Sequence, residues 1–238
     1  MFNLLKKTQE FLLDLILPIN CLGCGREKTW LCQNCLDSIP LIDKFTCPNC
    51  QNISLFGQTC AECRFKIPLT GLIAAVSYNQ PLVKKAVHAL KYNSIFALAK
   101  PLSQLLIKIL ANSPFHLALF KQENFLIIPI PLHRKKMAER GFNQAELLAR
   151  EISLRFGWPM ETKILKRIRY TKSQTELKEK DRLANVKDVF VVSNPSMVKD
   201  RNIILVDDLF TTGATMNEAA RALKRAEVKK IWGLVLAR

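Results

Sequence analysis

Eight cysteines, all that this 238-residue chain contains, lie between residues 21 and 63 as four Cys-x-x-Cys pairs. The pairs are Cys21/Cys24, Cys32/Cys35, Cys47/Cys50 and Cys60/Cys63. A Cys-x-x-Cys turn aims two thiolates at one ion, and two such turns complete a tetrahedral zinc site. A lone pair could be redox-active, and pairs could form disulfides, but four pairs so close together favour two structural zinc ions. Because sulfur fills every coordination position, such ions hold a fold together and activate no water.

The four pairs can share two ions in two ways. If the first two pairs bind one ion and the last two bind the other, only short loops are closed, which costs less chain entropy than an interleaved cross-brace. We therefore predict the sequential scheme, with the cross-brace as the alternative. So small a segment depends on its metal to fold. It either binds nucleic acid or protein, or braces its neighbour; seven Lys or Arg against six Asp or Glu in residues 1–70 argue against the main polyanion site lying here.

The first twenty residues predict a helix. Glu10 and Asp14 interrupt the apolar run that a secretory signal needs. Nowhere does the chain hold the roughly 20 consecutive apolar residues of a membrane span. Apolar side chains at helical spacing form one broad face up to Pro18, which ends the helix. That face packs on its own domain, the interpretation we favour, or lies on a membrane surface. We expect a cytoplasmic protein with no membrane span.

From residue 71 onward, apolar β-type runs alternate with helical stretches. This alternation predicts an α/β fold, a mostly parallel sheet flanked by helices, in which ligands bind beyond the carboxyl ends of the strands. We expect two domains: residues 1–68, with the N-terminal helix and a double zinc ribbon, and residues 69–238. The expected strands are 72–78, 126–130, 189–192, 203–206 and 231–236, and the expected helices are 81–90, 95–110 and 143–155.

Residues 203–215, IILVDDLFTTGAT, are the most informative stretch for function. A buried strand leads to two acids, then to a small polar loop and a helix. Backbone N–H groups and the helix dipole make such a loop a cradle for a phosphate, and Gly213 permits close approach. Carboxylates repel phosphate, so Asp207 and Asp208 suit ribose hydroxyls or Mg²⁺. We predict a ribose 5-phosphate site; the alternatives are two exposed acids at a strand end and, for Thr215, a capping box with Glu218.

At these residues the sequence resembles the type I phosphoribosyltransferases, whose motif for phosphoribosyl pyrophosphate (PRPP) is an apolar strand, two acids and a Thr-Thr-Gly-x-Thr loop. Within that superfamily it is similar to the ComF/GntX competence-protein family. The cysteine pairs, Leu90-Lys91-Tyr92 and residues 128–150 (IPIPLHRKKMAERGFNQAELLAR) carry this resemblance. A weaker similarity involves Gln174, Leu177, Arg182, Asn185 and Phe190. The resemblance covers nearly the whole chain.

The resemblance implies roles for individual residues. It makes Asp207 and Asp208 the ribose-hydroxyl acids, and it implies binding of Mg²⁺ with PRPP. The implied transfer reaction displaces pyrophosphate from ribose C1, with His133 a candidate base by proximity only. Its 5′-phosphate loop would be Thr211, Thr212, Gly213, Ala214 and Thr215. The pyrophosphate loop would be Pro131, Leu132, His133 and Arg134, with positive charge from Arg134, Lys135, Lys136 and Arg140, while Asn143 and Gln144 cap a helix or touch ligand.

Two features leave turnover open. The chain shows no hood motif for an acceptor, and every cysteine belongs to a zinc pair, which excludes the nucleophilic cysteine of an amidophosphoribosyltransferase. The net charge is +16, and residues 133–187 hold fifteen Lys or Arg against seven Asp or Glu. The alternative function is therefore a non-catalytic PRPP sensor, a single-stranded-DNA binder or both. The family resemblance also implies a competence helicase as a partner. The basic run 163–172 is a DNA groove or merely a solvated face. The nearest aromatic residues that could stack on bases are Tyr170, within the run, and Trp158.

Overall fold

The computed structural model describes residues 19–122, 125–170 and 188–238. The predicted N-terminal helix, and residues 174–185 of the weaker family resemblance, lie outside these ranges. Within them, no helix is both long and apolar enough to cross a bilayer. The helices are α2 (Gln33–Asp37), α3 (Pro81–Tyr92), α4 (Ala99–Ala111), α5 (Pro114–Gln122), α6 (Arg134–Arg140), α7 (Gln144–Phe156) and α9 (Ala214–Arg225). The strands are β1 (Gly71–Val76), β2 (Leu126–Pro129), β3 (Leu165–Arg167), β4 (Phe190–Val192), β5 (Asn202–Leu209) and β6 (Lys230–Ala237).

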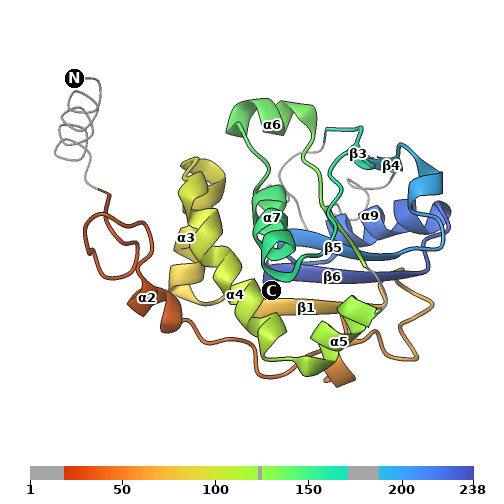
Figure 1. Cartoon of the computed structure of the whole chain (residues 1–238), viewed down its shortest axis with the longest axis horizontal. Coiled ribbons are helices and arrows are strands. Elements are labelled where there is room, and N and C mark those ends of the chain that lie inside the picture. The colour runs from red at the N-terminus through yellow and green to blue at the C-terminus, as the bar shows by residue number, and fades with distance from the viewer. Residues whose placement is uncertain (1–18, 123–124, 171–187) are drawn as a thin grey trace.

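Four strands form one sheet in the order β1-β6-β5-β2, and every pairing is parallel. Crossover helices separate strands that are consecutive in the chain, as parallel pairing requires. The register aligns Pro129 of β2 with Val206 of β5, and Leu209 of β5 with Ala237 of β6. The carboxyl ends of all four strands therefore meet at one edge of the sheet (Figure 1). The parallel α/β fold expected from the sequence is confirmed.

Helices cover both faces of this sheet (Figure 1). Ile204 and Val206 of β5 pack with α3, α4 and α7, whereas Ile203 and Leu205 pack with α9 on the other face. The four side chains are fully buried, because alternate residues of a strand point to opposite faces and both faces are covered. Helix α9 owes its place to a stripe of small apolar side chains, including Ala219 and Ala220.

The structure departs from the sequence expectations in three elements. The run 189–192 was expected in the parallel sheet, but β4 pairs antiparallel with β3 in a separate two-stranded ribbon that packs with α9. The expected loop at residues 131–134 is shorter than predicted, because the short helix α6 already begins at Arg134. Strand β5 extends through Leu209. Asp207 and Asp208 are therefore part of the strand, near its carboxyl end, rather than residues that follow it.

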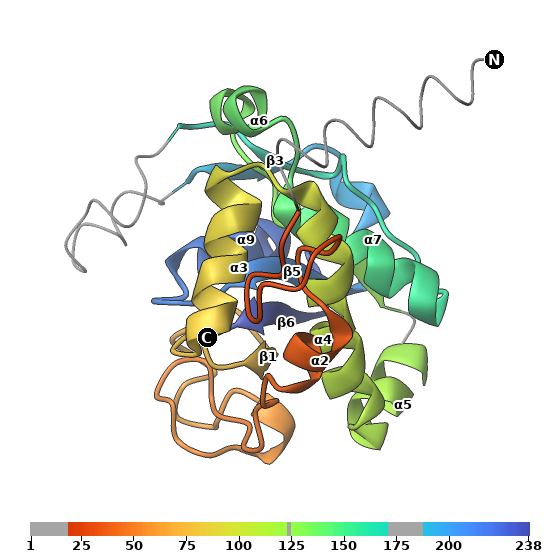
Figure 2. The same cartoon turned by 90° about the vertical axis from the view of Figure 1, so that its left-hand side faces the viewer.

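The two cysteine-bearing segments pack against the helices and the sheet (Figure 2). The first, drawn in red, lies on α3 and α4, where Leu31, Cys32 and Leu36 join the core beneath them. The second, drawn in orange, lies beside β1, where Gln58 pairs with Gly71. Strand β1 begins three residues after the predicted domain boundary at 68/69, which stays a prediction.

Candidate functional site

Asp207 and Asp208 lie at the carboxyl end of β5, and their surroundings differ. Asp208 is 3% exposed and forms an ion pair with Lys91, at the end of α3, at 2.5 Å from Nζ to Oδ2. Asp207 is half-buried, and its Oδ1 accepts a hydrogen bond from the backbone N–H of Asp208 at 2.9 Å. The structure thus presents one carboxylate, Asp208, that a cation neutralises, and a second, Asp207, directly before it in the strand.

Electrostatics separate the two acids further. Burial, and then the neighbouring charge of Asp208, raise the pKa of Asp207 well above its usual range, although the Lys91 ammonium acts in the opposite direction. Burial tends to lower the pKa of Lys91, but the attraction of Asp208 outweighs it and the pKa rises. Lys91 therefore stays charged, and the site can hold a proton on Asp207 until a ligand or cation replaces it.

Arg167 of β3 is a site residue that the sequence analysis missed. Burial lowers its pKa, and the negative charge of Asp207 acts in the opposite direction, so Arg167 lies within electrostatic range of that acid. Its guanidinium carbon stands 5.4 Å from the centre of the Phe190 ring in β4. The β3–β4 ribbon therefore places a positively charged side chain near Asp207. The sequence held only a weak signal for it, since Arg167 is one of several bases in the run 163–172.

The loop after β5 adopts the geometry expected of an anion cradle. Gly213 has φ +74°, and a Cβ there would lie 2.5 Å from Cζ of Phe210 and 2.9 Å from Nδ2 of Asn217. Only glycine meets both demands without strain. Thr211 is exposed, Thr212 is half-exposed, and Thr212 Oγ1 accepts a hydrogen bond from the Ala214 N–H at 3.4 Å. The loop therefore places the threonine hydroxyls next to the N–H groups at the start of α9, where both could bind an anion.

The alternative capping box between Thr215 and Glu218 is wrong. The residue before α9 is Gly213, and Thr215 lies inside the first turn. Glu218 is 2% exposed and accepts hydrogen bonds from the Asp188 N–H at 2.8 Å and from Arg221 at 3.1 Å. Glu218 thus secures the segment that leads into β4, and Thr215 is not needed for a cap.

The loop after β2 lies next to the acids. The Ile130 N–H donates to the Val206 carbonyl at 2.8 Å, one residue before Asp207. His133 then caps α6, with Nδ1 accepting from the Lys135 N–H at 3.3 Å. Asn143 caps α7 through the Ala145 N–H and donates to the Ile130 carbonyl at 3.0 Å. Capping therefore accounts for Asn143, which also ties α7 to this loop.

Positive charge gathers on α6 around this loop. Burial, and then Arg134, Arg167, Lys135 and Lys136, lower the pKa of His133 and keep its imidazole neutral. The ammonium groups of Lys135 and Lys136 stand 5.4 and 5.9 Å from the centre of the Tyr170 ring. A hollow of about 340 Å³ opens between this helix and the end of α3. Its lining residues are Lys91, Tyr92, Ser94, Lys136, Glu139, Arg140 and Tyr170.

The other two histidines do not line this hollow. His116 is fully buried and joined to Ser113 and to the Phe56 carbonyl, and burial lowers its pKa. His88 lies within α3 beside Tyr92. These contacts give both side chains ordinary structural roles.

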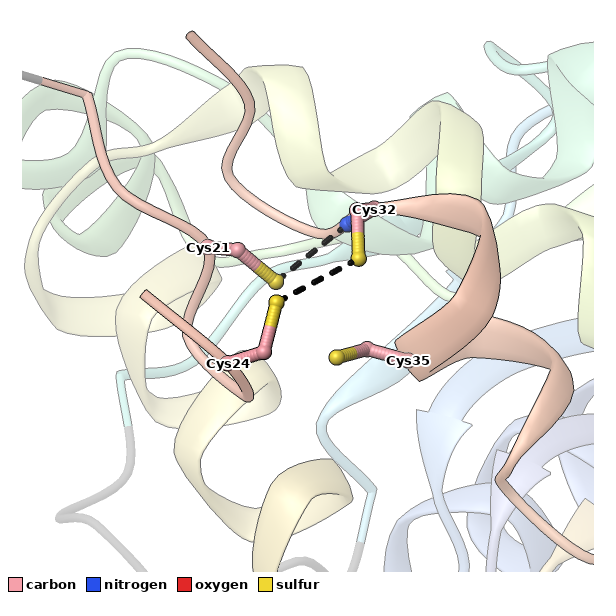
Figure 3. Close-up of side chains that lie close together, drawn as sticks. All are labelled: Cys21, Cys24, Cys32 and Cys35. Atoms are coloured by element: carbon pink, nitrogen blue, oxygen red, sulfur yellow. Dashed lines mark hydrogen bonds between the residues drawn. The ribbon is translucent and has the colours of Figure 1, made fainter. Parts of the chain in front are cut away.

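The eight cysteines form two groups of four, and the sequential pairing is the one that the structure brings together. In each group the sulfurs all lie within 4.8 Å of one another. Cys24 and Cys32 have sulfurs 3.6 Å apart, and Cys50 and Cys60 have sulfurs 3.8 Å apart. Four sulfurs about 2.3 Å from a central zinc stand about 3.8 Å from each other. Figure 3 shows the first group turned toward one centre, and both groups could hold zinc.

Hydrogen bonds to sulfur prepare the first group for a cation. Burial acts to raise the pKa of Cys21, but backbone N–H groups, that of Cys32 foremost, outweigh it and lower the pKa to about 6. In contrast, the neighbouring sulfurs of Cys24 and Cys32 raise the pKa of Cys35 to about 12. Four thiolates so close together need a shared positive ion, which is the role of zinc in such groups.

Comparison with known proteins gives matches both to the C-terminal part of the chain and to nearly its whole length. Residues 137–238 match the family model of the phosphoribosyl transferase domain. Competence protein F of Haemophilus influenzae is 29% identical over 225 residues, which cover 91% of this chain and 96% of the relative. DNA utilization protein YhgH of Shigella flexneri is 30% identical over 195 residues, 81% of this chain and 84% of the relative. The chain belongs to the ComF family. Competence protein ComFC of Bacillus subtilis is 28% identical over 229 residues, 85% of this chain and 88% of the relative.

In this ComF-family chain, the phosphoribosyl transferase match begins within α6 and contains β5, the Gly213 loop and α9. It excludes Lys91 and both cysteine groups. The similarity to Competence protein F spans 91% of the chain and so reaches into the cysteine-bearing segment as well. The ligand roles of the individual site residues stay predictions.

Proposed function

We propose that this protein binds PRPP together with Mg²⁺ and acts in natural transformation, in the handling of DNA that enters the cell. The phosphoribosyl transferase match supports the ligand class. The relatives named competence proteins and DNA utilization protein support the cellular role. The N-terminal cysteine groups, each with zinc, give this fold a structural brace rather than a second reactive centre.

The proposal depends mainly on one observation. The two acids at the end of β5 are followed directly by a loop whose conformation at residue 213 only glycine can adopt without strain. The N–H groups at the start of α9 and the hydroxyls of Thr211 and Thr212 suit a 5′-phosphate. Asp207 and Asp208 suit ribose hydroxyls, which donate hydrogen bonds where a phosphate would be repelled. The cations of α6 lie across the adjacent loop, where a pyrophosphate would extend from the sugar.

In the transfer reaction, the bond between ribose C1 and a pyrophosphate oxygen breaks, pyrophosphate leaves with the electron pair, and an acceptor bonds to C1. Mg²⁺ supplies charge neutralisation when it accompanies PRPP. Arg134, Lys135 and Arg140 stabilise the negative charge of the leaving pyrophosphate. Asp207 and Asp208 orient the sugar and offset the positive charge that develops on its ring.

Calorimetric titration of Mg²⁺-PRPP into the zinc-loaded protein tests this proposal. We expect one site in the wild type and at least a tenfold weaker Kd in Asp207→Asn and in Asp208→Asn. Asp200→Asn is the matched control, because Asp200 lies in the turn before β5 at the opposite end of the strand. Its φ of +57° suits asparagine. Absence of binding in the wild type would refute the proposal.

The same protein then distinguishes a transferase from a sensor. A pyrophosphate-release assay with PRPP and a panel of bases and amines gives turnover if the protein is a phosphoribosyltransferase. Binding without release for every acceptor identifies a non-catalytic PRPP sensor. Loss of release in Asp207→Asn separates turnover at this site from slow spontaneous hydrolysis of PRPP.

A second candidate function, binding of single-stranded DNA, is favoured by a basic groove away from the acids. It has a volume of about 770 Å³ and lies between the second cysteine group and α9. Phe65, 85% exposed, stands beside it as a platform on which a base could stack. The cations lining it are Arg64, Lys66, Arg221, Lys224 and Lys230. This groove replaces the run 163–172 as the favoured DNA surface, because part of that run forms β3, in which burial lowers the pKa of Arg167.

A further inference from the structure

Arg238, directly after β6, joins the second cysteine group to the sheet. Its guanidinium donates to the Thr46 hydroxyl at 2.9 Å and to the carbonyls of Cys47 and Pro48 at 3.5 and 3.4 Å. These three acceptors lie on the first turn of the Cys47–Cys63 group. A planar guanidinium is well suited to hold several oxygens of one turn in a fixed arrangement. In Figure 2 the C-terminus lies next to the orange segment.

The other side of the same guanidinium faces the loop of the proposed ribose-phosphate site. Its carbon stands 5.3 Å from the centre of the Phe210 ring, a cation–π distance. The Phe210 ring in turn fills the space beside Gly213, where an added Cβ would lie 2.5 Å from it. The Phe210 N–H also donates to the Ala237 carbonyl at 3.0 Å. Phe210 therefore lies between Arg238 and Gly213, the residue directly before α9.

The backbone of Arg238 is fixed as well. Its N–H donates to the Val76 carbonyl at 3.2 Å, and its own carbonyl accepts from the Tyr78 N–H at 2.7 Å. The side chain thus departs from a rigid point between β1 and β6. Burial lowers the pKa of Arg238, and negative charge at the second cysteine group acts in the opposite direction. A zinc ion bound by four thiolates still carries net negative charge, so the attraction persists when metal is present.

The first cysteine group makes contacts of a different kind. Lys85 of α3 donates to the Leu22 carbonyl at 2.9 Å, and Lys108 of α4 pairs with Asp37. These contacts anchor the first group on the helices that cover the sheet. The two groups therefore offer an internal comparison, one joined to the loop at residues 210–213 through Arg238 and the other joined to α3 and α4.

We propose that Arg238 is a positioning residue that couples metal binding at the Cys47–Cys63 group to the shape of the loop at residues 210–213. The inference rests on the proposed function where it concerns PRPP, because that loop is the proposed 5′-phosphate cradle. Coupling between two sites is reciprocal: metal at the second group favours the ligand, and the ligand retains that metal by the same factor.

The ligand-free protein provides the first test. A chelator removes zinc while pulsed alkylation, mapped by mass spectrometry, reports which cysteines become free. In Arg238→Ala, we expect the second group to lose zinc about tenfold faster than in the wild type, the usual order of such couplings. The first group should be unchanged, and backbone amides 211–217 should exchange hydrogen faster. Lys85→Ala, the matched control, should affect the first group and leave these amides unchanged.

Two further variants keep the test decisive. Arg238→Lys keeps the charge but loses the planar fork, so positional coupling predicts a result close to that of Arg238→Ala. Thr46→Val removes one acceptor and leaves β6 intact, and it should weaken the coupling even if Arg238→Ala folds poorly. Equal zinc loss and equal amide exchange in the wild type and all three variants would overturn the inference.

PRPP then tests the reciprocal effect. Mg²⁺-PRPP should slow zinc loss from the second group in the wild type but not in Arg238→Ala, whose Kd for PRPP should rise by about tenfold. If the wild type fails to bind PRPP, the proposed function falls, while the ligand-free results still decide the coupling. If PRPP binds equally well to wild type and Arg238→Ala, the proposed function stands and the coupling falls.

Discussion

Asp207 and Asp208 are adjacent in the chain, but the fold gives them different charges to face. Asp208 forms an ion pair with the ammonium of Lys91, whereas Asp207 has the like charge of Asp208 beside it and the positive charge of Arg167 within electrostatic range. The motif predicted both acids as site residues. Their two cations could not be predicted with it, because Lys91 comes from α3 and Arg167 from β3, and only the packing of these elements brings them to the acids.

At the residue scale, the raised pKa of Asp207 predicts the pH dependence of PRPP binding. A ribose hydroxyl donates to a carboxylate, so a protonated Asp207 must lose its proton before the ligand binds. The affinity should therefore rise with pH through the range in which Asp207 ionises, up to about tenfold per pH unit. Calorimetry between about pH 5 and pH 8 measures this slope. Because the PRPP phosphate also titrates near pH 6, the slope is compared with that of Asp207→Asn, which should be shallower; equal slopes would contradict the assignment.

Stability should change in the opposite direction at this residue. A carboxyl whose pKa is raised on folding binds protons more tightly in the folded state, so the unfolding free energy declines as pH rises from about 4 through the folded pKa. At pH 7 the buried like charges therefore weaken the fold. Asp207→Asn should lose PRPP binding and yet unfold at a slightly higher urea concentration than the wild type. A lower midpoint would show that Asp207 supports the fold rather than a ligand.

Gly213 provides the third residue-scale prediction. Gly213→Ala adds a Cβ at 2.5 Å from the Phe210 ring and also forces alanine to φ +74°. The left-handed conformation alone costs about 1–2 kcal/mol, and the clash adds to it. Gly157→Ala is the matched control, because it has φ +68° and open space around its Cβ. In urea denaturation Gly213→Ala should lose more stability than Gly157→Ala, and only Gly213→Ala should lose PRPP binding; equal losses would refute the cradle geometry.

At the element scale, strands with long apolar runs could be predicted from the sequence and very short strands could not. The long runs in β5 and β6 and the capped helix α7 were recognisable, because buried parallel strands and capped helices have strong local signals. The three-residue strand β3 was not predicted, and β4 was predicted as a strand but placed in the wrong sheet. Their place depends on α9, since Phe190 packs in the core that α9 covers, and so short a run does not specify its partner.

The two cysteine groups give the prediction at this scale. Zinc-loaded wild type should contain two zinc ions per chain, and Cys24→Ser should retain one, measured by mass spectrometry of the metal content. Because binding of such a metal contributes directly to folding, Cys24→Ser should also melt at a lower temperature. Free thiol counts under denaturing conditions provide the control. Fewer than eight free thiols after the metal is removed would indicate disulfides and contradict two zinc sites.

At the scale of the whole molecule, the proposed PRPP site and the basic groove lie at opposite ends of one strand, β6. Arg238 follows the carboxyl end of β6, near the Gly213 loop, whereas Lys230 begins that strand and lines the basic groove. Eight residues of β-strand span about 25 Å. The net charge of +16 predicted a polyanionic partner, but not where it binds. The groove is assembled from segments more than 150 residues apart, Lys66 and Arg221 among them, so no local pattern could reveal it.

The groove leads to the prediction that concerns the whole molecule. Each phosphate neutralised on a single strand contributes about −0.7 to the slope of log K against log salt. Arg64→Ala/Lys66→Ala should therefore make the slope for a labelled oligothymidine shallower by about 1.4, measured by fluorescence anisotropy, with PRPP affinity unchanged. Lys100→Ala/Lys121→Ala removes two exposed charges outside the groove and should leave the slope as it is.

Two further variants decide which surface the strand follows. Phe65→Ala should weaken oligothymidine binding by about 1–3 kcal/mol at every salt concentration, because it removes a stacking surface and no charge. Lys163→Ala/Lys166→Ala tests the basic run that the sequence first suggested. If that pair reduces the salt slope while Arg64→Ala/Lys66→Ala does not, DNA follows β3 past the acids, and PRPP and DNA should then compete for the protein. If the groove holds the strand, both ligands should bind at once, because their sites lie at opposite ends of β6.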